Sequence, residues 1–285
     1  YVKVGQKIGE ATGFVSSPIF SSVSGEVVDI RPMLVPLGVK SLAVVIKNDG
    51  KMEEYEGMQP RDYTKMTNDE ILTAVKEGGV VGMGGAGFPT HVKLAPPPGT
   101  KIDYVLVNAA ECEPYLTCDY RLMLEQSDKL IEGLKIVLKL HPNAKGVIGI
   151  EDNKPEAIKL LSEKVKDIPN IEVVSLLKKF PQGSEKHLIY AITKREVPSG
   201  ALPSAVGCIV DNVDTVASIY MAVCKSTPLM RKIITITGDA VAEPQNFNVK
   251  LGTNYQELIE AAGGFKTEPE KIISGGPMMG QALFT

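Results

Sequence analysis

The sequence has no tryptophan, and its four cysteines, at positions 112, 118, 208 and 224, form no C-x-x-C pair. Since iron–sulfur and structural zinc sites are usually built from closely spaced cysteines, these residues provide neither framework. No apolar run approaches the roughly 20 residues needed to cross a bilayer. The net charge of −3 provides no positive field, which argues against nucleic acid as a partner. We expect a soluble protein from a reducing compartment.

The length of 285 residues allows one large domain or two to three small ones. The pattern changes twice, near residues 60 and 230, which divides the chain into three regions. The sequence begins within a strand-like pattern and stops abruptly after residue 283. We therefore expect it to be part of a longer protein.

The first region, residues 1–60, is rich in strands and turns. Its V-x-x-G-Q…S-P…S-G-x-V spacing resembles a biotinyl- or lipoyl-like barrel-sandwich domain. Carriers of that type have an attachment lysine at a hairpin tip, whereas the matching tip here, residues 22–25, reads Ser-Val-Ser-Gly. We expect a structural module and not a swinging-arm carrier.

The second region alternates strands with helices, which predicts a parallel sheet with right-handed crossovers. Strands are expected at 104–108, 146–150, 171–176 and 208–210, and helices at 66–78, 119–140, 153–165, from 184, and 211–224. Ligands of such sheets bind at the carboxyl ends of the strands, and residues 108–113 follow one such end. The third region predicts a small β-grasp unit, with a helix over 254–262 that begins at a Thr253–Gln256 capping box.

A glycine loop is the feature on which the rest of the second region depends. Gly82, Gly84, Gly85 and Gly87 expose backbone N–H groups without side chains, and Pro89 begins a short helix that carries Lys93. The G-x-G-x-x-G spacing matches the dinucleotide fingerprint, but a helix precedes the loop and only two turns follow it, so a standard Rossmann site is not expected. The loop is either a tight turn or a cradle for a phosphate or a flavin-like ring.

Other polar residues give weaker signals. Glu111 and Glu113 flank Cys112 and point to opposite sides of an extended chain, so they form no acid–base pair and could belong to a solvated loop. Cys112 and Cys118 are expected to be small buried thiols. Asp211, Asn212 and Thr215 fit a helix cap, whose N–H groups could also bind a phosphate. No spacing predicts a metal site or a catalytic nucleophile.

Three motifs, at 82–90, 108–114 and 211–215, resemble the flavin subunit of respiratory complex I. Three others, Phe-Pro-Thr-x-Val-Lys-Leu at 88–94, Ala-Glu-Cys-Glu-Pro-Tyr at 110–115 and Gly-Gly-Pro-Met-Met-Gly at 275–280, resemble the RnfC family more closely. The resemblance implies an α/β fold with a Rossmann-like FMN/NADH-binding domain at 61–229. A barrel-sandwich hybrid domain at 1–60 would precede it, and an SLBB β-grasp domain at 230–285 would follow.

The resemblance also implies hydride exchange between NADH and noncovalent FMN, followed by electron transfer through 4Fe-4S clusters whose cysteine motifs are absent from this sequence. No side chain need act as a nucleophile or general acid, because the flavin carries the chemistry. The residues expected to bind FMN are Gly82, Gly84, Gly85, Gly87, Lys93, Asn108, Glu111, Asp211, Asn212 and Thr215. Those expected to contact the nucleotide are Phe88, Glu113 and Glu185. Met83, Ala110 and Ser184 depart from the complex I pattern, which has arginine, aspartate and glutamate there.

The implied partners are the membrane and iron–sulfur subunits of an Rnf complex, and ferredoxin indirectly. The chain would then lie peripherally on the cytoplasmic side of the cell membrane, bound only through those partners. Two alternatives remain open at this point. One is the related cobalamin reductase of propanediol-utilising microcompartments, and the other is a docking subunit that has lost its flavin.

Overall fold

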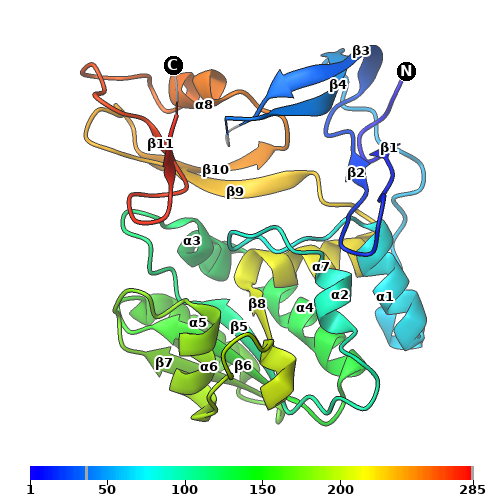
Figure 1. Cartoon of the computed structure of the whole chain (residues 1–285), viewed down its shortest axis with the longest axis vertical. Helices are drawn as coiled ribbons and strands as arrows, with labels where there is room; N and C mark the ends of the chain where they lie inside the picture. Colours follow the sequence, from blue (N-terminus) through cyan, green and yellow to red (C-terminus); the bar gives the residue numbers. More distant parts are fainter. Residues whose placement is uncertain (36–37, 284–285) are drawn as a thin grey trace.

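Four parallel strands form the central sheet, in the order β7, β6, β5 and β8 (Figure 1). Their bounds are Tyr104–Ala109 for β5, Lys145–Glu151 for β6, Ile171–Leu176 for β7 and Cys208–Asn212 for β8. The structure, a computed structural model, describes residues 1–35 and 38–283. The strands are rich in apolar residues because helices cover both faces of the sheet. The predicted parallel sheet is confirmed.

The helices divide unequally between the two faces of the sheet. One face is covered by α3 (Cys118–Glu125), α4 (Ser127–Leu140), α5 (Pro155–Val165) and α7 (Val213–Lys225), and the other by α6 (Glu185–Thr193). Side chains of β5 alternate accordingly: Val105 and Val107 join the larger core, and Leu106 joins the smaller core against Leu188 of α6.

The strand order determines where a ligand can bind. The chain proceeds outward from β5 through β6 to β7, and then returns through α6 to place β8 on the other side of β5. Right-handed crossovers require α6 to lie on the opposite face once the direction reverses, as it does. The reversal places the topological switch point at the carboxyl ends of β5 and β8, where open α/β sheets bind ligands.

Helix ends agree with the sequence in some places and not in others. The Thr67–Glu70 capping box at the start of α1 (Asn68–Glu77) is confirmed. The single helix predicted over 119–140 is wrong, because Gln126 leaves helical geometry and the two halves pack on different elements, α3 mainly on α5 and β9, α4 mainly on α7. The helix α8 (Tyr255–Ala261) is capped by Asn254 and not by Thr253.

Short connections complete the α/β body. The helix α2 (Thr90–Leu94) follows the glycine loop, as expected from Pro89. Two 3-10 turns, Tyr63–Lys65 and Pro203–Val206, precede α1 and β8. Within residues 1–35 and 38–283, no helix has the length and apolar character needed to cross a membrane.

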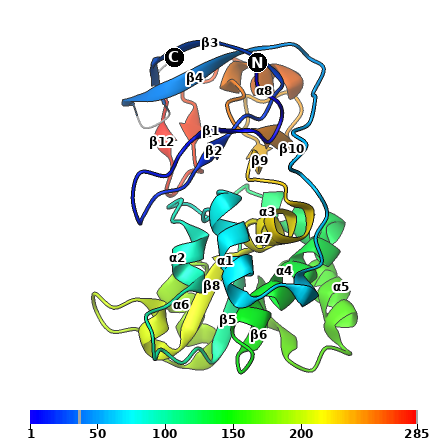
Figure 2. The ribbon, with the colours of Figure 1, turned by 90° about the vertical axis from the view of Figure 1, so that its right-hand side faces the viewer.

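The two ends of the chain form a β-rich half above the α/β body (Figures 1 and 2). The N-terminal pairs are β1 (Lys7–Gly9) with β2 (Ile19–Phe20) and β3 (Gly25–Leu34) with β4 (Lys40–Asn48). The C-terminal pairs are β9 (Arg231–Ile236) with β10 (Gln245–Lys250) and β11 (Ile273–Ser274) with β12 (Gln281–Ala282). Ser22, in the tip that lacks an attachment lysine, donates a hydrogen bond to the Leu251 carbonyl at 2.7 Å. The tip thus contacts the C-terminal segment.

Candidate functional site

Two asparagines mark the switch point, since Asn108 at the end of β5 pairs in register with Asn212 at the end of β8. Asn108 Nδ2 donates to the Gly183 carbonyl at 2.7 Å, which joins β5 to the segment before α6. Asn212 Oδ1 accepts from the Asp214 N–H at 2.9 Å and caps α7, while its Nδ2 donates to Asp119 Oδ2 at 2.6 Å. The two side chains therefore hold together four segments that meet at this edge.

The glycine loop, residues 82–87, is anchored at both ends and open between them. The Gly82 N–H donates to the Phe88 carbonyl at 2.8 Å, and the Met83 N–H donates to Thr215 Oγ1 at 2.8 Å. A Cβ built on Gly84 would lie 3.2 Å from Asn212 Cβ, so the loop lies directly against the end of β8. Residues 84–87 are exposed.

Gly85 and Gly87 give this loop its accessible backbone. Their φ angles are +144° and +64°, a region that L side chains rarely adopt, and a Cβ on either would have no neighbour within 4 Å. Among the residues that the structure describes, the N–H groups of residues 84–87 donate no hydrogen bond. The loop is therefore a cradle of free N–H groups and not only a tight turn.

A charged cluster lies beside the cradle, formed by Lys93 of α2, Glu185 of α6 and Asp211 of β8. Lys93 Nζ donates to the Val210 carbonyl at 2.7 Å and lies 3.3 Å from Glu185 Oε1 and 3.6 Å from Asp211 Oδ1. The Asp211 side chain is only 2% exposed, and burial raises the pKa of Asp211 to about 6 although Lys93 opposes the shift. Its Oδ2 has no hydrogen-bond partner in the described part of the chain.

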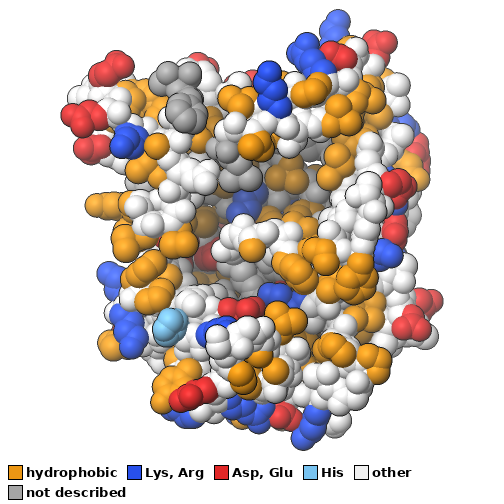
Figure 3. All heavy atoms as spheres, in the orientation of Figure 1, with side chains coloured by type: hydrophobic (Ala, Val, Ile, Leu, Met, Phe, Trp, Pro, Cys, Tyr) orange, Lys and Arg blue, Asp and Glu red, His pale blue; other side chains and the backbone are white. Residues whose placement is uncertain are grey.

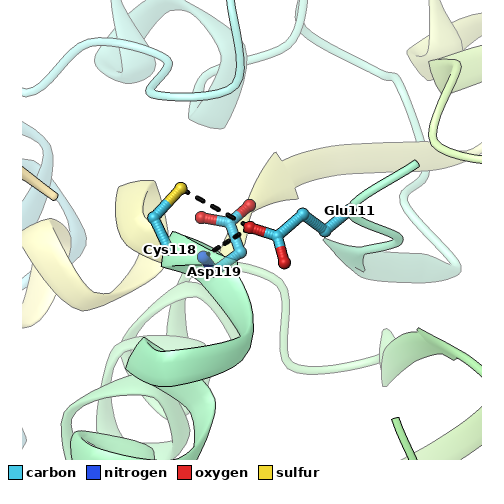
Figure 4. A group of neighbouring side chains, drawn as sticks. All are labelled: Glu111, Cys118 and Asp119. Atoms are coloured by element: carbon cyan, nitrogen blue, oxygen red, sulfur yellow. Dashed lines mark hydrogen bonds between the residues drawn. The ribbon is translucent and has the colours of Figure 1, made fainter. Parts of the chain in front are cut away.

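Glu111, Cys118 and Asp119 converge at the start of α3 (Figure 4). Glu111 accepts from the Asp119 N–H at 2.8 Å and lies 3.5 Å from the Cys118 thiol, with Lys154 Nζ 3.5 Å away. Its side chain is 3% exposed, so the solvated-loop alternative is wrong for this residue. Glu111 caps α3 from a distance.

The same three side chains are the geometry closest to a metal site among the described residues. Burial, strengthened by the two neighbouring carboxylates, raises the pKa of Cys118 to about 12, so its sulfur stays protonated. Burial, and then the charge of Glu111, raise the pKa of Asp119 to about 7. A protonated thiol and a carboxylate already used by a helix terminus are poor ligands, and the group fits a buried cap better than a metal centre. The expected burial of the Cys118 thiol is confirmed.

The three predicted nucleotide contacts lie at different places around the cradle. Phe88 is 39% exposed at the end of the loop, and Glu185 belongs to the Lys93 cluster. Glu113 Oε1 accepts from the Met278 N–H at 2.5 Å and from the Met279 N–H at 3.4 Å. The segment after β5 is therefore joined to the 275–280 motif near the C-terminus.

One contact was not foreseen from the sequence. Lys232 of β9 donates a hydrogen bond from Nζ to the carbonyl of Met83 in the glycine loop. It also lies 4.0 Å from Asp214 Oδ2, and Arg231 Nη1 is 2.8 Å from Asp214 Oδ1. No motif signals this contact, because Lys232 is one lysine in an amphipathic strand far along the chain. Figure 3 shows the hollow between the two halves, with charged side chains inside it.

Comparisons with known proteins agree with this arrangement. Residues 75–221 match the Nuo51 FMN-binding domain, residues 1–51 the RnfC barrel sandwich hybrid domain and residues 233–282 the SLBB domain. The chain is 50% identical over 282 residues to the RnfC-type subunit of the proton-translocating ferredoxin:NAD(+) oxidoreductase complex of Clostridium ljungdahlii. It is 46% identical over 284 residues to the Na(+)-translocating counterpart of Acetobacterium woodii.

These alignments cover 99% of this chain but 62% and 64% of the two relatives, so the chain spans less than two thirds of their length. The crystal structure of an NAD+-reducing NiFe hydrogenase in the H2-reduced state is similar with a TM-score of 0.58 and 21% identity, covering 71% of this chain and 40% of that one. That likeness concerns the fold alone. The predicted order of the three parts is confirmed, and the chain belongs to the RnfC family, with a Nuo51-type FMN-binding domain between a barrel sandwich hybrid domain and an SLBB domain.

Proposed function

We propose that this chain is the NADH- and FMN-binding part of an Rnf-type, ion-translocating ferredoxin:NAD+ oxidoreductase. The observation that carries the proposal is the open cradle of residues 84–87 at the switch point of the sheet. Free N–H groups that face away from the protein suit an anionic or electron-rich ligand, and the absence of Cβ atoms lets a flat ring approach the backbone. The cradle therefore fits FMN.

The surroundings of the cradle suit the two ends of that cofactor. The start of α7 lies against the loop through Thr215, and a helix N-terminus favours a phosphate. Lys93 has the positive charge that would offset a reduced, anionic flavin, while Asp211 holds it in place. Asn108 would present its amide at the end of β5. Bound FMN would supply the hydride acceptor and the conversion from two-electron to one-electron transfer.

Phe88, Glu113 and Glu185 remain our proposal for the nicotinamide nucleotide. Phe88 is exposed enough to stack on a ring. Glu113 is held by the backbone of residues 278–279, so its role would include fixing the 275–280 motif beside the nucleotide. Glu111 is buried as a cap, and we propose that it acts on the flavin side by positioning α3.

The proposal extends to partners because the relatives are subunits of complexes named for ferredoxin and NAD+. The membrane and iron–sulfur subunits of such a complex would be the direct partners, with ferredoxin reached through them. The 4Fe-4S clusters would be bound outside the residues of this chain. Association with the cytoplasmic side of the membrane would then depend on those partners.

An anaerobic titration tests the proposal. The chain is incubated with FMN, freed of excess cofactor and titrated with NADH while flavin absorbance near 450 nm is followed. We expect stoichiometric FMN and bleaching by one equivalent of NADH. A chain that binds no FMN would support the docking-subunit alternative, and one that binds FMN without bleaching would refute the nucleotide assignment.

A further inference from the structure

A cation from the C-terminal unit reaches into the glycine loop. Residues 82–92 contain no lysine or arginine, so the loop itself has no positive side chain. Lys232, at the second position of β9, supplies one and donates from Nζ to the Met83 carbonyl. The two residues are 149 positions apart in the sequence. The contact joins the SLBB unit to the cradle.

The Lys232 ammonium is held by acidic groups below the loop. Asp214, whose side chain is 1% exposed, lies 4.0 Å away and is itself paired with Arg231 at 2.8 Å. The charge of Lys232 also opposes the rise in the pKa of Asp119, which places it close to that carboxyl as well. Asp119 is bonded to Asn212, the cap of α7. Lys232 therefore links the loop to the start of both α3 and α7.

The effect of this contact falls on the backbone of Met83. The Met83 N–H is bonded to Thr215 and the Met83 carbonyl to Lys232, so two consecutive peptide groups are fixed just before Gly84. Glycine-rich backbone is otherwise the most mobile in a chain, and a ligand must offset the entropy of ordering it. Fixing the entry to the loop lowers that cost.

We propose that Lys232 is a positioning residue of the flavin site, by which the SLBB unit orders the glycine loop and places a positive charge beneath it. The inference rests on the proposed function for its ligand, FMN. It makes the C-terminal unit a part of the cofactor site and not only a docking module. A residue on a different domain then controls how well the cradle is formed before any cofactor arrives.

The experiment compares Lys232→Met and Lys232→Arg with Lys250→Met, an exposed lysine on the neighbouring strand β10. Hydrogen exchange of a peptide covering residues 80–92 is measured without FMN, and FMN affinity is measured by fluorescence quenching. We expect Lys232→Met to speed exchange several-fold and to weaken FMN about tenfold, the effect of losing one charge-assisted hydrogen bond. Lys232→Arg should restore most of both, and Lys250→Met should change neither. The visible circular dichroism of bound FMN should change in Lys232→Met alone.

The two readouts separate this inference from the proposed function. If the unmodified chain binds no FMN, the proposed function fails, while exchange in the 80–92 peptide still decides whether Lys232 orders the loop. Exchange in Lys232→Met equal to that of the unmodified chain would overturn the inference, as would unchanged FMN affinity. Should Lys232→Met not fold, Lys232→Gln takes its place, since it keeps an N–H donor but no charge. Unchanged exchange and affinity there would equally overturn it.

Discussion

Gly87→Ala is the sharpest test of the cradle, because its two expected effects can be separated. Gly87 has φ = +64° and open space where a Cβ would be, so alanine is strained there without a clash. A left-handed L-residue costs about 1 kcal/mol. Gly99 offers a matched control, with φ = +84° and equally open space, in the loop that follows the prolines at 96–98. We expect both variants to lose about 1 kcal/mol of unfolding free energy, measured by urea denaturation.

FMN affinity should distinguish the two variants. At residue 87 the new methyl group occupies space beside free N–H groups, so a flat ring can no longer lie at van der Waals distance from the backbone. We expect at least about a tenfold loss of FMN affinity, equivalent to ~1.4 kcal/mol, for Gly87→Ala and no loss for Gly99→Ala. Fluorescence titration of FMN measures it.

Two results would count against this reasoning. If Gly87→Ala loses the expected stability yet binds FMN as tightly as the unmodified chain, the flavin lies elsewhere and the cradle argument is refuted. If Gly87→Ala loses no stability, the backbone argument itself is wrong. A loss of affinity in both variants would point to a general effect of loop strain and would also contradict the assignment.

Three further predictions concern stability. Lys93→Ala should lower the unfolding free energy by about 2 kcal/mol at pH 8 and by less at pH 5, where Asp211, with a pKa of about 6, is protonated; urea denaturation at both values measures it. Asp119 has a folded pKa of about 7 against an ordinary value of 3.8, so the folded state holds a proton that the unfolded state has lost, and stability falls as the pH rises from about 4 to 7. Asp119→Asn should remove that fall and gain on the order of 2 kcal/mol over the unmodified chain at pH 8 relative to pH 4, which thermal unfolding across this range would test. Gly133→Ala should cost about 3 kcal/mol, measured by denaturant unfolding, since a Cβ would lie 2.1 Å from the Val216 carbonyl oxygen where α4 meets α7.

Local patterns were sufficient for much of this fold. The apolar runs at 104–108, 146–150 and 171–176 are strands, because only buried strands of a parallel sheet accept such sequences. The capping box at Thr67 and the Pro89-led helix form as expected, since their signals act within one turn. The family and the order of its three parts also followed from motifs in the sequence.

Tertiary structure decided the features that depend on distant residues. The break at Gln126 arises because α3 and α4 pack on different elements, which no helix periodicity reveals. Glu111 is a buried cap because α3 begins beside it, whereas its neighbours in sequence suggest an exposed loop. Lys232 reaches Met83 only because β9 crosses over the end of the sheet. The sequence by itself determined which residues form the cradle, and the packing of three separate regions decided what holds it open.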